Sequence, residues 1–282
     1  MLTMATLQRL WRASRPLTAT GVLMLAALAA SLAAMAVDPT QLLGAPRWLK
    51  PAKFAISSAF YVFTLAWIFT WLPERRRLTA IVGWISAVVI AIEVGIIDLQ
   101  AARGVTSHYN VGTALDAALF GTMGIGILIA WFAAIVLTVS LFRHRFADEA
   151  LGWALRLGLL LTVIGQATGG FMTMPTQAQL AAAKTQRITV AGAHTVGAPD
   201  GGPGLPITGW SREHGDIRVA HFVGMHAVQV LPAIALLLAP FASAIPRRRA
   251  VLLAAAVYAA VFTLLLVQAL NGHPLVPTMV SR

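Results

Sequence analysis

The chain of 282 residues contains no cysteine. This absence excludes disulfide bonds, thiolate catalysis and cysteine-ligated zinc or iron–sulfur centres. Any metal site must therefore use His, Asp, Glu or neutral oxygen ligands. Charge is scarce as well, since 11% of the residues are charged, whereas soluble domains carry about 25%. Together with a hydrophobic share of 58%, this composition is typical of an integral membrane protein.

Acidic residues are fewer than basic ones, which leaves a formal net charge of +11. Most of the basic residues stand in short arginine clusters between apolar runs, as topology signals of membrane proteins do. No long basic stripe and no soluble domain accompanies them. We therefore expect the lipid bilayer as a partner and no nucleic acid.

Long apolar runs are the main feature that the sequence does contain. A membrane helix needs about 20 mostly apolar residues, and seven segments meet this requirement: 17–37, 53–72, 78–100, 115–142, 151–172, 219–241 and 249–270. The predicted fold class is an all-α integral membrane protein, with one membrane domain over residues 1–282 that forms a seven-transmembrane-helix bundle. The first run is longer than the usual ~7–15-residue core of a signal peptide, so we interpret it as a retained helix.

The positions of lysine and arginine predict the direction of the bundle. Short connections on one side carry dense arginine clusters, namely Arg9, Arg12 and Arg15, then Arg75–Arg77, Arg143 with Arg145, and Arg247–Arg249. Short basic loops stay in the cytoplasm, whereas long loops cross largely regardless of their charge. We therefore expect a cytoplasmic N-terminus, an outer C-terminus and a place in a bacterial inner (plasma) membrane.

Residues 173–218 form the one long connection between the predicted helices. The stretch TQAQLAAAKTQR predicts a short surface helix, and GAHTVGAPDGGPGLPITGW is too rich in Gly and Pro for regular structure. A loop of this length is usually functional or disordered. We expect this outer loop to cover a pocket as a lid.

Glycine pairs recur within the predicted helices. Gly165 and Gly169, and likewise Gly121 and Gly124, predict close helix packing, because small residues let two backbones approach. The stretch PDGGPG at 199–204 lacks the lysine and the following helix of a phosphate-binding loop.

Polar groups of several predicted helices fall at one depth below the outer surface. At about 1.5 Å per helical residue, His226, Glu93 and Gln166 each lie roughly 10 Å inside. Polar groups in hydrocarbon are costly and normally face the protein interior. The pattern therefore predicts a shared interior site that opens to the outside.

Within this layer, the sequence predicts specific roles. The catalytic candidates are Glu93 and His226, and the candidate cofactor contacts are Gln100, Arg103, Gln166 and Gln229. The candidate metal ligands are Glu93, His108, His214, His221 and His226. On an ideal helix His221 and His226 point about 140° apart, so they could share an ion only on a distorted helix. Asp98 or Asp216 would orient an imidazole ligand, or pair with Arg103 and Arg218.

The leading functional hypothesis is a metal- or haem-dependent membrane enzyme with its site in the outer half of the bundle. Imidazole and carboxylate ligands suit iron, copper or zinc. A lipid-soluble substrate such as a quinol would enter from the bilayer, and we expect redox chemistry. Metal-assisted hydrolysis would use the same residues.

Two further functional classes stay open at this point. In a proton-coupled transporter, Glu93 and His226 would form the relay, as carboxylate–histidine chains do in pumps. The lack of an internal repeat and of a polar path in the cytoplasmic half counts against this class. The third class is a non-catalytic subunit or assembly factor of a membrane complex. A homo-oligomer or a partner in such a complex is compatible with all three.

Overall fold

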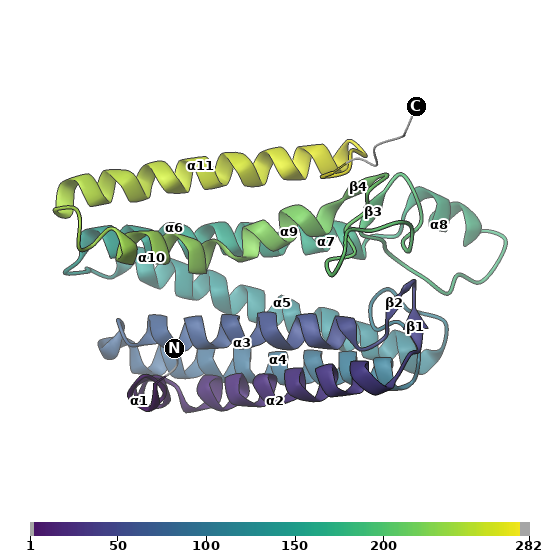
Figure 1. Cartoon of the computed structure of the whole chain (residues 1–282), viewed down its shortest axis with the longest axis horizontal. Coiled ribbons are helices and arrows are strands. Elements are labelled where there is room, and N and C mark those ends of the chain that lie inside the picture. Colours follow the sequence, from purple (N-terminus) through teal and green to yellow (C-terminus); the bar gives the residue numbers. More distant parts are fainter. Residues whose placement is uncertain (1–2, 277–282) are drawn as a thin grey trace. The chain divides into compact units, whose positions relative to one another are not determined.

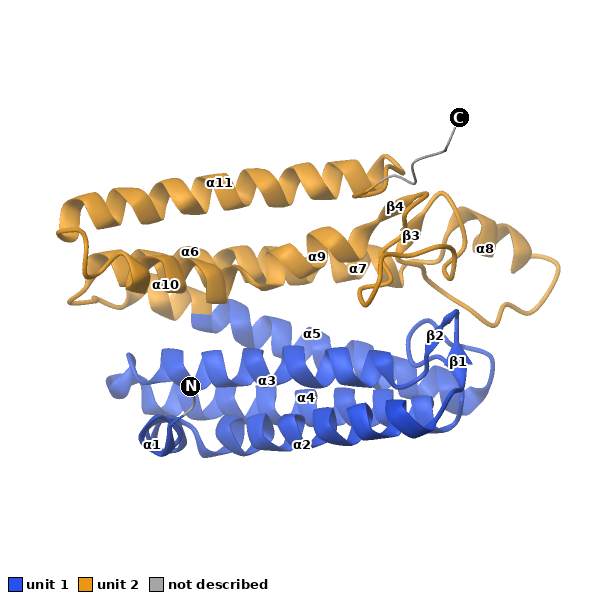
Figure 2. Ribbon diagram, viewed as in Figure 1, with its two compact units in different colours: residues 1–137 blue, residues 138–282 orange. Residues whose placement is uncertain are grey.

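The computed structural model describes residues 3–276 and forms two compact units, residues 1–137 and 138–282 (Figure 2). Six of its helices are long and apolar enough to cross a membrane, and a bent helix pair adds a seventh span if it counts as one. The all-α architecture of a membrane protein is therefore confirmed. The seven-span count and the orientation stay predictions.

Unit 1 is built from long helices that run side by side (Figure 1). They are α2 (Arg15–Val37), α3 (Leu49–Phe69), α4 (Arg76–Ala102) and the larger part of α5 (Ala114–Arg143). Helix α2 packs along α3, and both contact α4. Gly21 lies against the ring of Phe63, 2.5 Å from where a Cβ would stand, so glycine is what lets α2 approach α3.

A short helix that the sequence analysis did not predict, α1 (Met4–Ala13), precedes α2. Ser14 separates the two helices with an extended backbone, at a φ of −158°. Pro16 then stands in the first turn of α2, where its missing N–H costs no hydrogen bond. Figure 1 shows α1 nearly end-on and α2 lengthwise, so the chain turns sharply at Ser14.

A hairpin connects α2 to α3, and it consists of β1 (Gln41–Leu42) and β2 (Ala45–Pro46). Its two turn residues, Leu43 and Gly44, have φ values of 50° and 75°. Two consecutive positive φ angles are what a two-residue hairpin turn needs to match the strand twist. After α3, the 3-10 turn η1 (Pro73–Arg75) leads into α4.

Unit 2 is arranged around α6 (Glu149–Ala167). This helix contacts α9 (Ile217–Met225), α10 (Ala227–Leu237) and α11 (Ala244–Leu270). The short helix α7 (Gly169–Thr173) follows α6 after a break at Thr168. The predicted segment 151–172 therefore contains two helices, because an apolar run shows its length but not an internal turn.

The predicted span 219–241 is also interrupted, since α9 and α10 meet at His226 with a bend of 44°. Pro232 lies inside α10 and not at the bend. Thr162 of α6 forms hydrogen bonds at this break, as described below, and a hydropathy pattern does not register the bend.

The long connection 173–218 is partly ordered by local hydrogen bonds. It contains the expected short helix, α8 (Gln177–Ala182), which begins with a capping box of Thr176 and Gln179. The Gly/Pro-rich part is mostly irregular, as expected, but it includes the two-residue strands β3 (Thr195–Val196) and β4 (Gly215–Asp216). Gln179 also binds both backbone polar groups of Gly192, which ties α8 to the rest of the loop.

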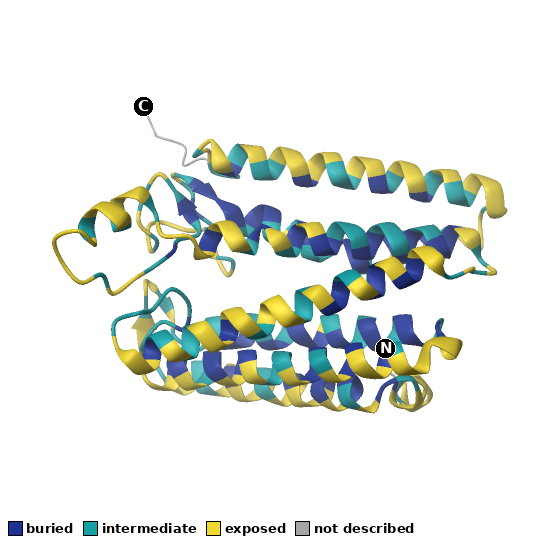
Figure 3. Ribbon diagram, turned by 180° about the vertical axis from the view of Figure 1, so that it is seen from behind, coloured by how far each residue is buried: buried dark blue, intermediate teal, exposed yellow. Residues whose placement is uncertain are grey.

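Much of each long helix is exposed (Figure 3), and many of these exposed residues are large and apolar. On α11, Leu253 and Leu264 are 67% and 69% exposed, and only 17% of the apolar window of this helix is buried. In water such a surface would aggregate, whereas hydrocarbon solvates it. The exposed faces therefore agree with a bilayer environment.

Candidate functional site

The most unusual group in unit 1 is the carboxylate of Glu93 on α4. Its residue is only 5% exposed. One oxygen, Oε1, lies 3.6 Å from Nε2 of His108, and the other, Oε2, is buried and has no hydrogen-bond partner among the described residues. The structure thus brings together two residues that the sequence analysis proposed separately as metal ligands.

His108 lies in the turn between α4 and α5, where aromatic rings surround it. Phe54 of α3, Tyr109 and Phe120 of α5 have their ring centroids 5.6, 6.0 and 6.3 Å away. Its other ring nitrogen, Nδ1, is 3.1 Å from the hydroxyl of Ser107. The side chain of His108 is 23% exposed and that of Glu93 is 7% exposed. The imidazole therefore stands between the buried carboxylate and the surface.

The backbone beside this imidazole is strained. Tyr109 has a φ of 62°, in the left-handed region that bulky residues rarely adopt. Such a conformation costs on the order of 1–3 kcal/mol and persists where the surroundings enforce it. Asn110 helps to hold this turn, because its side chain donates a hydrogen bond to the Thr106 carbonyl and accepts one from the Gly112 N–H. Strain of this kind is common at functional sites.

A polar network fixes the two helices on either side of this turn. Gln100 is fully buried and donates to Asp116, and Arg103 donates to both of them. Thr113 donates to the second oxygen of Asp116. Gln100 and Arg103 thus join α4 to α5 and hold the His108 turn, while their predicted role in cofactor binding stays a prediction. Arg103 pairs with Asp116 rather than with Asp98.

In unit 2, His221 of α9 lies against the end of α6. Its Nδ1 is 3.0 Å from the carbonyl oxygen of Gly165 and 3.1 Å from the hydroxyl of Thr168. Because a carbonyl can only accept, Nδ1 carries the proton and Nε2 keeps its lone pair. An added Cβ on Gly169 would stand 3.3 Å from the imidazole. The glycine at this position therefore makes room for the ring.

His226 occupies the break between α9 and α10. Its Nδ1 is 2.8 Å from the carbonyl oxygen of Phe222, whose ring stacks on the imidazole at 4.1 Å. This carbonyl likewise makes Nδ1 the protonated nitrogen. Two glutamines of unit 2, Gln166 on α6 and Gln229 on α10, each have a buried Oε1 without a hydrogen-bond partner in the described chain. The sequence-derived group His226, Gln166 and Gln229 thus contains unsatisfied acceptors in unit 2.

Side chains of other helices stabilise the break at His226. Thr162 of α6 is fully buried; it donates to the Met225 carbonyl and accepts from the Val228 N–H. Tyr258 of α11 donates to the Val223 carbonyl at 2.5 Å. These hydroxyls replace backbone hydrogen bonds that the bend removes, as irregular membrane helices require. The sequence analysis missed both residues, although a hydroxyl inside an apolar run is a usable signal.

Asp216 organises the entrance of α9. It is 1% exposed, and it accepts hydrogen bonds from the Ser211 N–H, the Arg218 N–H and the Arg218 guanidinium. Burial raises the pKa of this carboxyl, but the hydrogen bonds and charge of Arg218 outweigh burial and leave the pKa below its usual value. The expected Asp216–Arg218 ion pair is therefore present.

The imidazole beside Asp216 is that of His194, a residue that was not among the ligands proposed from the sequence. Its Nδ1 is 3.2 Å from Asp200 and 3.8 Å from Asp216. His214 was one of the proposed metal ligands. Its backbone N–H donates a hydrogen bond to the Ser211 hydroxyl. The separation of His194 from Asp216 along the chain hid this contact from sequence reasoning.

The described residues do not form an evident centre for a bare metal ion. Between residues 3 and 276, no group of three or more His, Asp or Glu side chains is arranged to hold one. Glu93 and His108 are a pair in unit 1, and His221 and His226 belong to unit 2. No protein-family model, curated protein or solved structure matches this chain.

Proposed function

We propose that this chain is an integral membrane protein that exchanges protons at Glu93, with His108 as the relay to the outer aqueous phase. The observation that carries the proposal is the pairing itself. A carboxylate inside an apolar helix lies 3.6 Å from an imidazole that is partly exposed. This is the proton-coupled class of function, with His108 rather than His226 as the partner of Glu93.

The cost of burying a carboxylate supports this proposal. An ionisable residue within a membrane helix is expensive, and such residues commonly carry protons or ions. Glu93 Oε2 has no hydrogen-bond donor in the described structure, so no hydrogen bond holds this oxygen in its charged form. A carboxyl that can be neutral or charged is what proton exchange needs.

The distance between the two groups also suits exchange. At 3.6 Å the contact is longer than a hydrogen bond, and catalytic hydrogen bonds are often long in resting structures. A small movement of the His108 turn would close it. The Gln100–Arg103–Asp116 network limits such movement to the turn, because it holds α4 and α5 on both sides.

An infrared experiment on the full-length protein tests the proposal without a known substrate. In pH-jump difference spectra, we expect a carboxyl C=O band that is lost in Glu93→Gln and shifted in His108→Ala. Glu213→Gln is the matched control, because Glu213 is exposed. His226→Ala tests the other relay partner.

The outcomes separate the alternatives clearly. Loss of the band in E93Q, together with a slower change of this band after the pH jump in H108A, supports the pairing of Glu93 with His108. If H226A slows exchange and H108A does not, His226 is the partner and the assignment of His108 is wrong. A wild-type spectrum without a band that depends on Glu93 contradicts proton exchange at this residue.

A haem- or metal-dependent enzyme acting on a lipid-soluble substrate is the second candidate. The observation in its favour is the orientation of His221, whose Nδ1–H is held by the Gly165 carbonyl. Metal-binding histidines usually donate their other N–H in this manner. His221 could hold a haem iron with a single imidazole, whereas a bare ion would need more ligands than the described groups supply.

Metal analysis and an absorption spectrum of the purified protein test this second candidate. We expect near-stoichiometric iron and a haem absorption band, both lost in His221→Ala and kept in His273→Ala. If protein purified without chelators holds no iron, copper or zinc, the hypothesis of a haem- or metal-dependent enzyme is contradicted.

A further inference from the structure

One end of unit 1 concentrates positive charge that the described chain does not neutralise. We call it the basic end, and it consists of Arg9, Arg12, Arg15, Arg75, Arg76 and Arg77. The segments that carry these arginines hold one acidic residue, Glu74. In the described part of the chain, Arg75, Arg76 and Arg77 make no ion pair and are exposed.

Unit 2 treats a similar cluster differently. There Arg247 pairs with Asp148, and Arg248 pairs with Glu149 at 3.0 Å. An arginine cluster can therefore act as a topology signal while its side chains form ion pairs with carboxylates of the same chain. The arginines of the basic end are therefore available to anionic groups outside the chain.

Helix α1 gives the basic end an apolar side. On a helical wheel, Met4, Leu7 and Trp11 fall within about 60° of one another, with Arg9 and Arg12 on the other side. Met4 and Trp11 are 75% and 45% exposed. An exposed amphipathic helix with arginine on its polar face and tryptophan on its apolar face is typical of one that lies in the membrane interface.

Contacts within unit 1 keep α1 close to the second arginine cluster. Arg9 donates to the Thr70 hydroxyl at 3.3 Å, and its guanidinium lies 5.9 Å from the Trp71 ring. Leu10 is buried in the same unit, so α1 is anchored. Ser14 lies 3.0 Å from where a Cβ of Gly83 on α4 would stand. The two clusters therefore belong to the same end of unit 1.

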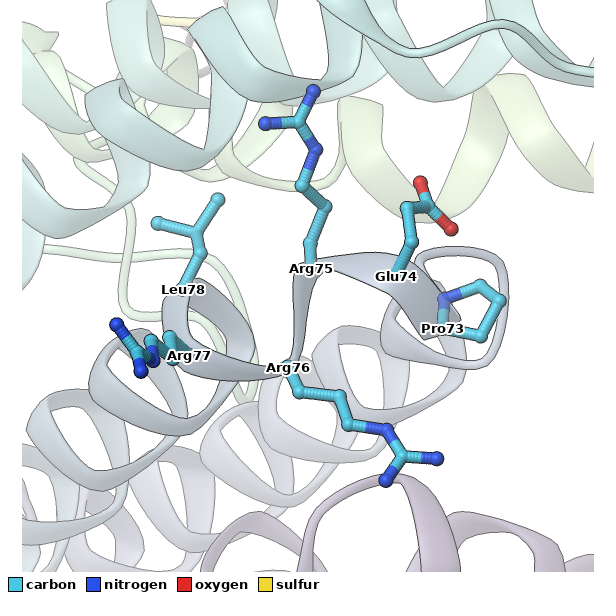
Figure 4. Close-up of a pocket in the computed structure, with 6 residues that line it drawn as sticks. All are labelled: Pro73, Glu74, Arg75, Arg76, Arg77 and Leu78. Carbon is cyan, nitrogen blue, oxygen red and sulfur yellow. The ribbon is translucent and has the colours of Figure 1, made fainter.

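The turn at Pro73–Leu78 is hollowed, with a volume of about 550 Å³ (Figure 4). The figure shows the side chains of Arg75, Arg76 and Arg77 pointing in different directions around this turn. One guanidinium group can donate two parallel hydrogen bonds to the oxygens of a phosphate, and it is more weakly hydrated than an ammonium group. The turn thus offers separate guanidinium donors for lipid phosphates, while α1 offers an apolar contact beside it.

We propose that the basic end binds anionic phospholipid, with the lipid phosphate at Arg75–Arg77 and the acyl region beside Trp11. The charge selects an anionic headgroup, and the exposed apolar residues of α1 select a lipid over a free anion. This site is separate from Glu93, so it stands or falls independently of the proposed proton exchange.

Native mass spectrometry of the full-length protein in detergent tests the site. Phosphatidylglycerol and phosphatidylcholine are titrated separately, and retained lipid is measured. We expect phosphatidylglycerol to bind at least tenfold more tightly, and R76Q/R77Q to lower its affinity about thirtyfold, since each basic residue near an anionic surface contributes roughly fivefold. R143Q/R145Q is the charge-matched control in unit 2, and it should leave the affinity unchanged.

Several results would overturn the proposal. Equal retention of the two lipids would remove its basis, and an equal loss in R76Q/R77Q and R143Q/R145Q would show an effect of net charge alone. Complete displacement of the lipid by inorganic phosphate would identify a free-anion site. If R76Q/R77Q does not fold, R12Q/R15Q tests the same end, and an unchanged affinity there contradicts the role of the N-terminal segment.

Discussion

Among the described residues, several buried side-chain oxygens have no hydrogen-bond partner, and three of them belong to residues proposed for catalysis or cofactor binding. They are Oε2 of Glu93 and the Oε1 atoms of Gln166 and Gln229. An unsatisfied buried acceptor costs about 1–3 kcal/mol, and in native proteins such atoms usually have a functional or ligand-related explanation. Depth along the helices singled out Glu93 and Gln166 from the sequence, whereas Gln229 was proposed because it shares a helical face with His226.

Asp216 is a residue whose charge should matter for stability. Replacement by Asn keeps a side chain that can cap α9 but removes the charge that pairs with Arg218. Breaking a buried pair on one side costs about 3–5 kcal/mol. We expect D216N to lose about 3 kcal/mol in chemical unfolding in detergent, and the exposed E213Q to stay within about 0.5 kcal/mol. Equal stability of D216N and wild type would contradict this role.

The lowered pKa of Asp216 also sets a pH dependence. The folded protein binds a proton at Asp216 less readily than the unfolded chain, whose Asp titrates near ~3.9. Its stabilisation is therefore complete well above that pH and is lost as the pH falls through the folded pKa. We expect the melting temperature of D216N to fall less steeply than that of wild type below about pH 4. Parallel curves would show that Asp216 does not contribute.

Gly165 should tolerate no side chain. A Cβ there would stand 2.5 Å from the Cα of Gly224 on α9, a backbone atom that cannot rotate away. Overpacking typically costs about 1–3 kcal/mol, so G165A should lower the melting temperature clearly. G170A is the matched control, because a Cβ at Gly170 meets nothing within 4 Å. Similar melting temperatures for the two variants would contradict the close approach of α6 and α9.

At the scale of the elements, one face of α6 carries the packing of unit 2. Gly158, Thr162 and Gly165 are spaced so that they share this face, and each meets α9 or α10. Gly158 and Gly165 let the backbones of α10 and α9 approach α6. Thr162 supplies hydrogen bonds at the break between α9 and α10. The predicted close packing at Gly165 is confirmed. Gly121 and Gly124, for which the same was expected, meet no atom within 4 Å of an added Cβ.

The break between α9 and α10 should depend on the Thr162 hydroxyl. In Thr162→Val the shape is kept, but the Val228 N–H and the Met225 carbonyl lose their partner. Hydrogen bonds between membrane helices are worth about 0.6–1.7 kcal/mol each, so we expect a loss of about 1–3 kcal/mol in unfolding measurements. Thr263→Val is the control, since Thr263 is exposed and bonds only within its own helix. A loss of the same size in both variants would refute the role of Thr162.

At the scale of the whole molecule, the bent pair α9–α10 decides how many times the chain crosses the membrane. If the pair is one span, the two ends of the chain lie on opposite sides; if it is re-entrant, they lie on the same side. The absence of cysteine makes this question accessible, because a single introduced cysteine is the only reactive thiol.

Single cysteines at Thr3 and His273, both exposed, therefore report the topology. We expect a membrane-impermeant maleimide to label H273C on intact cells and T3C only after permeabilisation. This follows from the arginine distribution and from seven crossings. Glu213→Cys is the positive control for the long connection, which we expect outside. Labelling of H273C only after permeabilisation would show that α9–α10 does not span.

The sequence by itself determined the class of the protein and the position of most helices. Apolar runs of about 20 residues are a sufficient signal for membrane helices, because hydrocarbon admits only backbone that is hydrogen-bonded internally. The same cost argument identified Glu93 and His226 as exceptional, since polar groups inside apolar segments stand out without any knowledge of their neighbours.

Only the tertiary structure decided which of these groups meet. The Glu93–His108 contact, the position of His194 beside Asp216 and the break at His226 all depend on side chains far apart in the sequence. Hydropathy is a property of single residues averaged along a segment, so it carries no information on contacts between segments. Partners, bends and unsatisfied atoms arise from packing, and packing exists only once the helices are assembled.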